Sequence, residues 1–273
     1  SRWVAKPTRP SACLASRVVE ALVSGDNDVV RMREPNPNLQ EALRALAKAR
    51  DLMDAGVFAE AVQQVRVAIN LRPDLGVCHL MLAEGLSACH ERGAMDAARR
   101  ATELNPALID AWRELGDCYL ESRQAARAEE AYREAIARDK SFAPGFAKLA
   151  QALLEQGRSR EALEAITAAQ ERGGDSFFVA AVRGDILAEM ERHNEAAEAY
   201  DQATHLEPED HWGLHQAARE HCRAGHDDRA AELFERALRF DHDGCHQTLV
   251  DYGDLLRRVG RIGDAVRMYR RAV

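Results

Sequence analysis

A spacing of about 34 residues recurs along most of the chain and limits what it can fold into more than any other feature. In the clearest copy, small and large apolar residues lie at helical spacing, at Trp112, Leu115, Gly116, Tyr132 and Ala135. Including this one, seven copies begin near positions 42, 76, 109, 143, 177, 211 and 246. A unit this short cannot bury a core alone, so we predict stacked helical units in place of two globular domains.

Each position of the repeat has a physical role. Small residues such as Gly116 allow the first helix of a pair to cross the second at close range. We expect large residues such as Tyr132 and Tyr200 to fill the space between successive pairs. Glycines such as Gly157 end the first helix in a left-handed turn, and prolines such as Pro73 stop the second helix.

These residues give the chain a resemblance to the tetratricopeptide repeat family over residues 42–273, with about seven repeats. The resemblance implies an all-α fold, a right-handed superhelical solenoid of antiparallel helix pairs. It also implies that the first helix of each pair lines a concave face that binds other proteins. The 49 alanines and 15 aromatic residues of the chain agree with many close helix crossings.

Residues 1–41 precede this array and form a predicted leader. Prolines at positions 7, 10, 35 and 37 interrupt it, and an apolar stripe from Leu14 to Val23 predicts one short helix between Pro-containing linkers. This helix either covers the first repeat or docks into the groove of a neighbouring copy. Because the chain starts without Met and ends within a helical pattern, we expect it to be part of a longer polypeptide.

Charge and composition argue against several classes of function. The net charge of −8 disfavours a general nucleic-acid surface, which needs an excess of Lys and Arg. No stretch stays apolar for the roughly eighteen residues that a membrane span requires. The six cysteines show no CxxC spacing, which is typical of free thiols in a reducing compartment and predicts a cytoplasmic protein.

The residues expected to line the groove, by the resemblance, come from the first helix of each pair. The first two repeats offer a largely apolar end with Arg50, Met53, Leu80 and Glu84. The middle repeats offer a mostly acidic surface with Asp110, Arg113, Glu114, Asp117, Glu121, Lys148, Gln151, Glu155, Phe178, Asp185 and Glu189. The last two repeats offer a more positive surface with Trp212, His215, Arg219, Arg223, Asp254 and Arg257.

This change of sign predicts the kind of partner. A concave surface concentrates the field of its charges, so the groove would orient an extended segment. We expect four acids to meet basic side chains of a protein or peptide, namely Asp117, Glu121, Glu155 and Glu189. We expect three arginines to meet an acidic group or chain terminus, namely Arg219, Arg223 and Arg257. The alternative is that these residues belong to ordinary solvated helix faces.

No motif for catalysis is present, since GxSxG, HExxH and Gly-rich phosphate loops are all absent. We therefore predict neither an enzyme nor a cofactor. Two groups of residues are candidate metal ligands. His211 and His215 lie one helical turn apart, and His242, Cys245 and His246 lie around a turn. The spacing is loose, so we predict no metal. We expect most of the eight histidines after residue 190 to be polar residues of turns and exposed flanks, namely most of His193, His205, His211, His215, His221, His226, His242 and His246.

Cys222 is the one cysteine expected to face the groove. Arg219 and Arg223 beside it could lower the pKa of its thiol. We favour the simpler interpretation, in which Cys222 is a small groove residue without reactivity.

Three hypotheses for function remain. The first is a scaffold or adaptor without catalysis, which binds a peptide or helical segment of a partner in the concave groove. The second is the substrate-recruiting arm of a larger enzyme, such as a glycosyl or sulfuryl transferase or an oxygenase, whose catalytic domain lies outside this chain. The third is a scaffold that self-associates through the leader or through the ends of the array.

Overall fold

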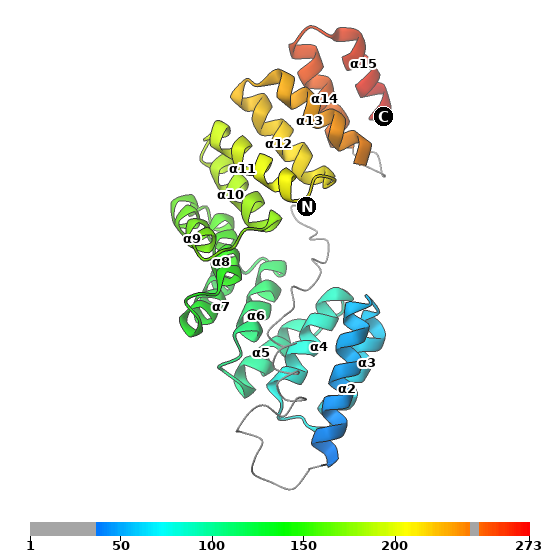
Figure 1. Ribbon diagram of the computed structural model, residues 1–273, viewed down its shortest axis with the longest axis vertical. Helices are drawn as coiled ribbons and strands as arrows, with labels where there is room; N and C mark the ends of the chain where they lie inside the picture. Colours follow the sequence, from blue (N-terminus) through cyan, green and yellow to red (C-terminus); the bar gives the residue numbers. More distant parts are fainter. Residues whose placement is uncertain (1–36, 241–245) are drawn as a thin grey trace. The chain divides into compact units, whose positions relative to one another are not determined.

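The computed structural model describes residues 37–240 and 246–273 (Figure 1), and these form fourteen helices. The chain divides into two compact units, Ser1–Lys140 and Ser141–Val273. Unit 1 contains α2 (Pro37–Asp54), α3 (Phe58–Leu71), α4 (Gly76–Ala88), α5 (Ala94–Leu104), α6 (Ile109–Glu121) and α7 (Ala125–Arg138). Unit 2 contains α8 (Ala143–Glu155), α9 (Ser159–Glu171), α10 (Phe177–Glu189), α11 (His193–Leu206), α12 (His211–Ala224), α13 (Asp227–Phe240), α14 (His246–Arg258) and α15 (Ile262–Arg271).

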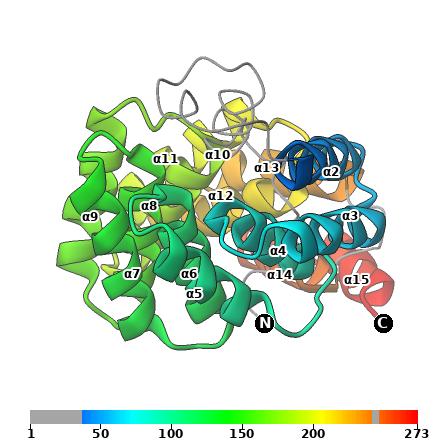
Figure 2. The same ribbon diagram turned by 90° about the horizontal axis from the view of Figure 1, so that it is seen from below.

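Consecutive helices pack as pairs within each unit, from α2 with α3 to α14 with α15. A second helix also packs against the first helix of the next pair, and Figure 2 shows α3 beside both α2 and α4. First helices of neighbouring pairs contact each other as well, as α4 does with α6, α8 with α10, and α12 with α14. The predicted all-α solenoid of antiparallel helix pairs is therefore confirmed.

Left-handed residues end several first helices, as the sequence predicted. Gly157 after α8 has a φ of 73° and Gly225 after α12 has a φ of 83°, and no other group lies within 4 Å of where their Cβ atoms would be. Arg123 and Glu191 take the same conformation after α6 and α10, each with a φ of 57°. The helix pair therefore requires a left-handed residue at this turn, and glycine only lowers the conformational free energy of that backbone geometry.

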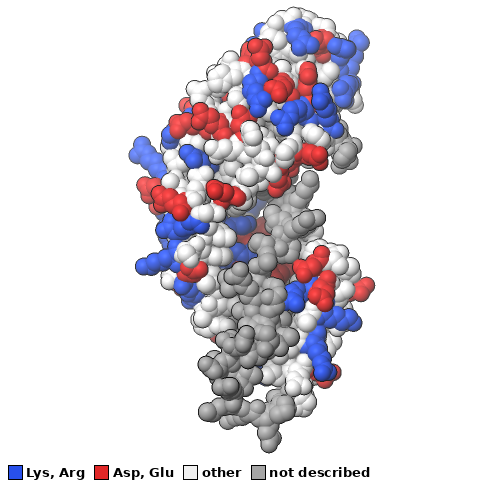
Figure 3. Space-filling view, in the orientation of Figure 1, with Lys and Arg blue, Asp and Glu red and all other residues white. Residues whose placement is uncertain are grey.

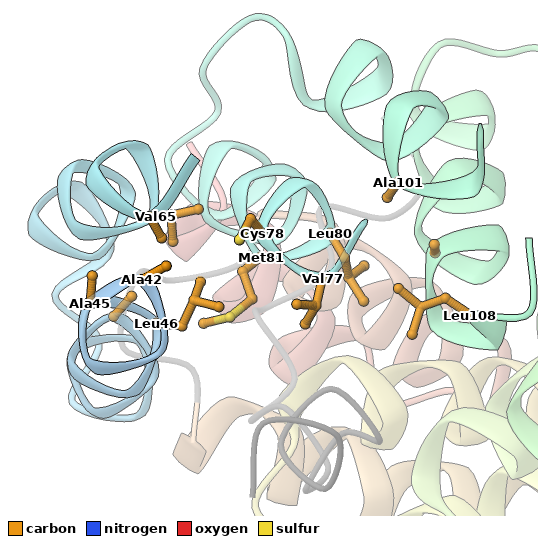
Figure 4. Close-up of a cluster of buried hydrophobic side chains, with 13 residues drawn as sticks. Ala42, Ala45, Leu46, Val65, Val77, Cys78, Leu80, Met81, Ala101 and Leu108 are labelled. Atoms are coloured by element: carbon orange, nitrogen blue, oxygen red, sulfur yellow. The ribbon is translucent and has the colours of Figure 1, made fainter. Parts of the chain in front are cut away.

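The core of unit 1 consists of small and medium side chains (Figure 4). Leu46 of α2, Val65 of α3 and Leu80 of α4 are fully buried there, and Met81 is nearly so. We expected Leu80 to line the groove, and this prediction is wrong. The structure places Leu80 in the core, where its side chain has no exposed surface to offer a partner.

The large aromatic residues pack within their own helix pairs as well as between successive pairs. Tyr132 of α7 lies against Gly116 of α6, within its own pair, because the missing side chain of the glycine leaves room for the ring. Tyr200 of α11 packs in the same way on Gly184 of α10. Tyr200 also meets the next pair, where its ring centroid lies 6.2 Å from that of Trp212 in α12. Phe234 of α13 does the same with Tyr252 of α14, at 5.6 Å between ring centroids.

The first described helix, α2, begins at Pro37, a residue that suits the first turn because no hydrogen-bonded N–H is needed there. The remaining first helices begin at Gly76, Ile109, Ala143, Phe177, His211 and His246. The helix predicted between Leu14 and Val23 lies outside the described residues, and the leader of residues 1–41 stays a prediction. Within the described ranges, no helix combines the length and apolar character needed to cross a bilayer.

Candidate binding faces on the first helices

In unit 1, four acidic residues predicted to line the groove surround the guanidinium of a fifth predicted groove residue, Arg113. Arg113 Nη1 lies 2.8 Å from Asp117 Oδ2 and 3.5 Å from Glu114 Oε2. Arg113 Nη2 lies 3.4 Å from Glu84 Oε1, and Nε lies 3.6 Å from Asp110 Oδ1. Four carboxyl groups thus surround a single positive charge. We call Arg113 and these four acidic residues the Arg113 cluster.

The local sequence explains most of this arrangement. Asp110, Arg113 and Asp117 are three and four residues apart, which places them on one face of α6. Asp110 lies in the first turn of α6, where the helix dipole favours a negative charge. Glu84 belongs to α4 and joins the cluster because α4 and α6 lie in contact.

Carboxyl groups outnumber positive charges in the Arg113 cluster. Burial raises the pKa of Glu114, and nearby Asp117 raises it further, against the opposing effects of Arg113 and of the Ser87 hydroxyl, which lies 3.0 Å from Glu114 Oε1. Asp110 is also buried, and its Oδ2 atom accepts no hydrogen bond from any described residue. A further cationic donor at this face would therefore be stabilised.

Three groove acids have a second, structural role that the sequence prediction missed. A tyrosine hydroxyl of the following helix donates to each of them, from Tyr132 to Asp117 at 2.7 Å, from Tyr200 to Asp185 at 2.6 Å and from Tyr269 to Asp254 at 2.9 Å. The signal was present as a Gly-Asp pair in three repeats, each followed by a tyrosine 15 residues after the aspartate. These acids therefore fix the second helix as well as contributing charge to the face.

In unit 2, the predicted residues of α8 and α10 form a mixed surface. Lys148 Nζ lies 4.9 Å from the ring centroid of Phe178, a cation–π contact between the two first helices. The Oε1 atom of Gln151 is buried and accepts no hydrogen bond from the described residues. Glu155 and Glu189 are exposed, so they are the acidic side chains that remain accessible on these helices.

Further along unit 2, His215 is buried and joins two first helices. Its Nδ1 atom lies 2.9 Å from Thr248 Oγ1, and its Nε2 atom lies 3.2 Å from Asp251 Oδ2 in α14. Arg219 Nε lies 3.7 Å from the same carboxyl oxygen. His215 and Arg219 are therefore partly committed to holding α12 against α14.

A second histidine, His221, is buried between α12 and α11. Its Nε2 atom lies 3.1 Å from Asp201 Oδ2, and its Nδ1 atom lies 3.2 Å from Nδ1 of His226. We expected most of the C-terminal histidines to lie in turns or on exposed flanks, and His215 and His221 are exceptions because both are buried. Each is buried because a carboxylate on an adjacent helix accepts its hydrogen bond.

The thiol of Cys222 is not activated. Burial raises its pKa to about 11, and the arginine that opposes this effect is Arg258, whose Nη1 atom lies 3.0 Å from the Cys222 carbonyl oxygen. Arg223 instead pairs with the buried Glu220 at 2.6 Å. The possibility of a lowered thiol pKa is therefore contradicted, because desolvation outweighs the nearby positive charge.

The remaining predicted residues are spread over the first helices. Arg50 and Met53 of α2 and Trp212 of α12 are half-buried. Asp254 and Arg257 of α14 are exposed and form an ion pair at 3.2 Å. Among the described residues, no group of three or more His, Cys, Asp or Glu side chains is arranged to hold a metal ion, while His242 and Cys245 lie outside them.

Repeated helix pairs, stacked through their first and second helices, define this molecule as an α-helical repeat solenoid. A family model described as tetratricopeptide repeat matches residues 82–144, and one described as tetratricopeptide repeat-like domain matches residues 146–220. The chain belongs to the tetratricopeptide repeat family, whose fold is that of protein-interaction scaffolds. A search of curated proteins finds no match to the chain.

Solved structures share this fold at low sequence identity. A structure from the functional characterisation of Pseudomonas aeruginosa pilF has a TM-score of 0.69 and 17% identity, covering 82% of this chain and 100% of that chain. Cut9 with Hcn1, from an APC/C hetero-tetramer, gives a TM-score of 0.70 and 14% identity over 96% of this chain and 46% of that chain. YrrB, described as a TPR protein with an unusual peptide-binding site, gives 0.56 and 18% over 65% and 91%.

Proposed function

We propose that the protein is a non-enzymatic scaffold that binds a basic segment of a partner protein at the Arg113 cluster of unit 1. The observation that carries this proposal is the convergence of four carboxyl groups on one arginine. A face with this excess of acid attracts cations, and its half-buried position strengthens the attraction relative to bulk water. The resemblance of YrrB, described with a peptide-binding site, supports a peptide as the ligand.

The accessible members of the face would make the contacts. The side chains of Glu84 and Asp117 are 23% and 19% exposed, so each can accept a hydrogen bond from an incoming Lys or Arg while keeping Arg113 as a partner. Glu121 is exposed one helical turn beyond Asp117 and extends the acidic surface along α6. Each exposed ion pair contributes only about 0.2–1 kcal/mol, so several must act together.

Two exposed acids on the first helices of unit 2, Glu155 on α8 and Glu189 on α10, give that unit a weaker face of the same kind for basic side chains. The free thiols of Cys78, Cys89, Cys118 and Cys222 support a reducing, cytoplasmic location as part of the proposal. The recruiting arm of a larger enzyme and self-association through the array ends stay predictions.

A labelled peptide tests the proposal. We expect a fluorescein-labelled peptide of alternating Lys and Ser residues to bind the full chain at low ionic strength, and a matched peptide of Glu and Ser not to bind. Glu121→Arg should weaken Lys-Ser peptide binding about tenfold, equivalent to about 1.4 kcal/mol, because it replaces attraction with repulsion. Glu130→Arg is the matched control, since Glu130 is an exposed acid on the second helix α7.

Fluorescence anisotropy in increasing salt provides the measurement, and binding should weaken as salt screens the charges. Equal losses for Glu121→Arg and Glu130→Arg would contradict the proposal, because the peptide would then sense only net charge. Binding of the Glu-Ser peptide with similar affinity would contradict it as well.

A further inference from the structure

A groove runs along the solvent-facing side of the second helix α9 in unit 2. Its volume is about 520 Å³, and its lining comes from α9 and from Met190, which follows α10. A second hollow, of about 440 Å³, adjoins it at the turn between α8 and α9 and shares Arg160 and Met190 with it. The two hollows form one continuous surface, which we call the α9 groove. The residues of α9 that line its larger part are Arg160, Leu163, Glu164, Thr167, Ala168 and Glu171.

The floor of the α9 groove is apolar. Leu163 and Ala168 are half-buried, and Leu163 packs against the buried residues Leu187 of α10 and Ala196 of α11. Met190 is half-buried too and lies at the end of the groove that Arg160 also lines. An apolar hollow with a few polar groups around it is typical of an interaction site.

The other repeats show that this floor is particular to α9. In α7, Glu129 stands in the register of Leu163, and it pairs at 2.6 Å with Arg133, which stands in the register of Thr167. The Thr167 hydroxyl instead donates to the Leu163 carbonyl oxygen of its own helix at 2.8 Å. Charged residues also hold the register of Thr167 in α11 and α13, namely Asp201 and Glu235. The α9 groove is therefore apolar where neighbouring repeats place charge.

Charged side chains of opposite sign stand along the rim. Arg160 is exposed at one end, and Glu164 and Glu171 are exposed further along α9. Within the described ranges, Arg160 and Glu164 form no ion pair, and Glu171 has only Arg172 nearby, at 3.9 Å. Figure 3 shows basic and acidic side chains close together over the part of the molecule where Figure 1 places α9. The groove thus presents positive charge at one end and negative charge towards the other.

The spacing of these charges sets the length of a ligand. Arg160 and Glu171 stand eleven positions apart, which corresponds to about 16 Å along an α-helix. An extended chain covers about 3.3 Å per residue, so about five residues span this distance. Alternate side chains of such a segment point to the same side, so its first, third and fifth side chains would enter the groove.

We propose that the α9 groove binds a short extended segment of a partner protein that carries a carboxylate, an aliphatic side chain and a basic side chain at alternate positions. The carboxylate would pair with Arg160, the aliphatic side chain would cover Leu163, and the basic side chain would pair with Glu171. This groove lies on a second helix of unit 2, whereas the Arg113 cluster lies on first helices of unit 1, so the two sites fail or stand independently.

A five-residue peptide tests the proposal with the full chain. The probe is the acetylated and amidated peptide Asp-Ser-Leu-Ser-Lys, and its control has Ser in place of Leu. Methionine methyl groups labelled with ¹³C give the readout by NMR, because Met190 lies in the groove, and Met190→Leu identifies its signal. We expect the Leu peptide to shift the Met190 signal until it saturates, and the Ser peptide to bind at least about fivefold more weakly.

A charge variant tests the rim. Arg160→Glu replaces attraction of the peptide carboxylate with repulsion and should weaken binding about fivefold. Arg239→Glu is the matched control and should leave binding unchanged, since Arg239 is exposed on the second helix α13 and forms no ion pair with another described residue. Glu121→Arg, which alters the acidic face of unit 1, should also leave binding unchanged.

A double variant tests the floor. Leu163→Glu with Thr167→Arg copies the ion pair of α7, so the repeat should still fold while its apolar floor is lost. We expect binding to weaken at least about fivefold, because the Leu side chain of the peptide then meets charge. Far-UV circular dichroism verifies that each variant keeps its helicity.

Four results would overturn the proposal. A Met190 signal that the Leu peptide leaves unmoved would show that the groove does not take this ligand. Equal binding of the Leu and Ser peptides would show that the apolar floor does not select. Binding lost in Glu121→Arg and kept in Arg160→Glu would place the peptide at the Arg113 cluster. Self-association in sedimentation experiments, abolished by the double variant, would show that a second copy of this chain covers the groove.

Discussion

The ring of Tyr132 lies directly on Gly116, so a Cβ atom at position 116 would come within 2.4 Å of Tyr132 Cε1. The Tyr132 hydroxyl then donates to Asp117, the next residue along α6. The same arrangement recurs twice in unit 2, and the three sets are Gly116, Asp117 and Tyr132; Gly184, Asp185 and Tyr200; and Gly253, Asp254 and Tyr269. Glycine, aspartate and tyrosine thus act together as a lock between the two helices of a pair.

We predict that Gly184→Ala destabilises unit 2. The added methyl group would lie 2.7 Å from Tyr200 Cζ, too close for a ring that is itself buried. Overpacking costs about 1–3 kcal/mol, partly offset by about 0.5–1 kcal/mol because alanine favours a helix over glycine. The net loss should appear in urea unfolding as a lower midpoint with an unchanged slope.

Two further variants make that test specific. Gly263→Ala in α15 adds a methyl group with no atom within 4 Å, so it should leave stability unchanged or raise it slightly. Gly184→Ala with Tyr200→Ile copies the pairing of Ala150 with Ile166 in the neighbouring repeat and should recover much of the loss. If Gly184→Ala and Gly263→Ala behave alike, the contact with Tyr200 does not constrain the helix crossing.

We predict that each of these tyrosine hydroxyls contributes more to the free energy of unfolding the more deeply it is buried. Tyr132 is fully buried, and its bond to Asp117 measures 2.7 Å, so Tyr132→Phe should cost about 1–2 kcal/mol of unfolding free energy. Tyr269 and Asp254 are more exposed, so water can replace the bond lost in Tyr269→Phe, and the cost should be about half or less. Chemical denaturation of both variants provides the comparison. A larger loss for Tyr269→Phe would contradict this explanation.

We predict that acid weakens unit 2 through its histidine–aspartate pairs. Burial opposes ionisation of Asp201 and Asp251. For Asp201 the hydrogen bond and charge of His221, together with Arg229, outweigh burial, so its pKa is lowered. For Asp251 the hydrogen bond and charge of His215, together with Gln247 and Arg219, have the same effect. A lowered folded-state pKa stabilises the protein above the unfolded value of about 3.9 and loses that contribution as pH falls through the folded value. The free energy of unfolding should therefore decrease steadily below about pH 4.

The variant Asp251→Asn tests this assignment. It should be less stable than the parent chain at neutral pH and should show a smaller further loss on acidification, because it lacks one of the titrating carboxylates. Asp228→Asn, at an exposed aspartate in the first turn of α13, is the control and should keep the parent pH dependence. Parallel pH profiles for the parent chain and Asp251→Asn would show that this pair does not drive the acid response.

Thiol labelling should follow burial. The pKa values of Cys78 and Cys118 are raised to about 12 and that of Cys222 to about 11, mainly by desolvation. Only the thiolate reacts with iodoacetamide, so these three cysteines should stay unlabelled at neutral pH in the folded protein and react in denaturant. Peptide mapping by mass spectrometry gives the result. Rapid labelling of Cys222 in the folded state would contradict its inert environment.

The sequence was a good guide to the helices and a poorer guide to the partners of their side chains. The small residues at Gly116 and Gly184 correctly indicated close helix crossings, because that requirement repeats in every copy. We did not predict from the sequence that Asp117 and Asp185 also accept a hydrogen bond from a tyrosine hydroxyl. A Gly-Asp pair followed by Tyr nevertheless recurs in three repeats. His215 was interpreted as a surface residue because its partners, Thr248 and Asp251, belong to another helix.

By itself, the sequence determined the repeat length, the helix pairs, the turns and the family, since these depend on residue types at fixed local spacing. The tertiary structure alone decided that Glu84 of α4 joins the acids of α6 around Arg113, that Leu80 is core and that Cys222 has a raised pKa. It also decided that Leu163 and Met190 line one groove. Charge pairing and desolvation depend on which side chains neighbouring helices bring together, and that proximity arises only when the pairs stack.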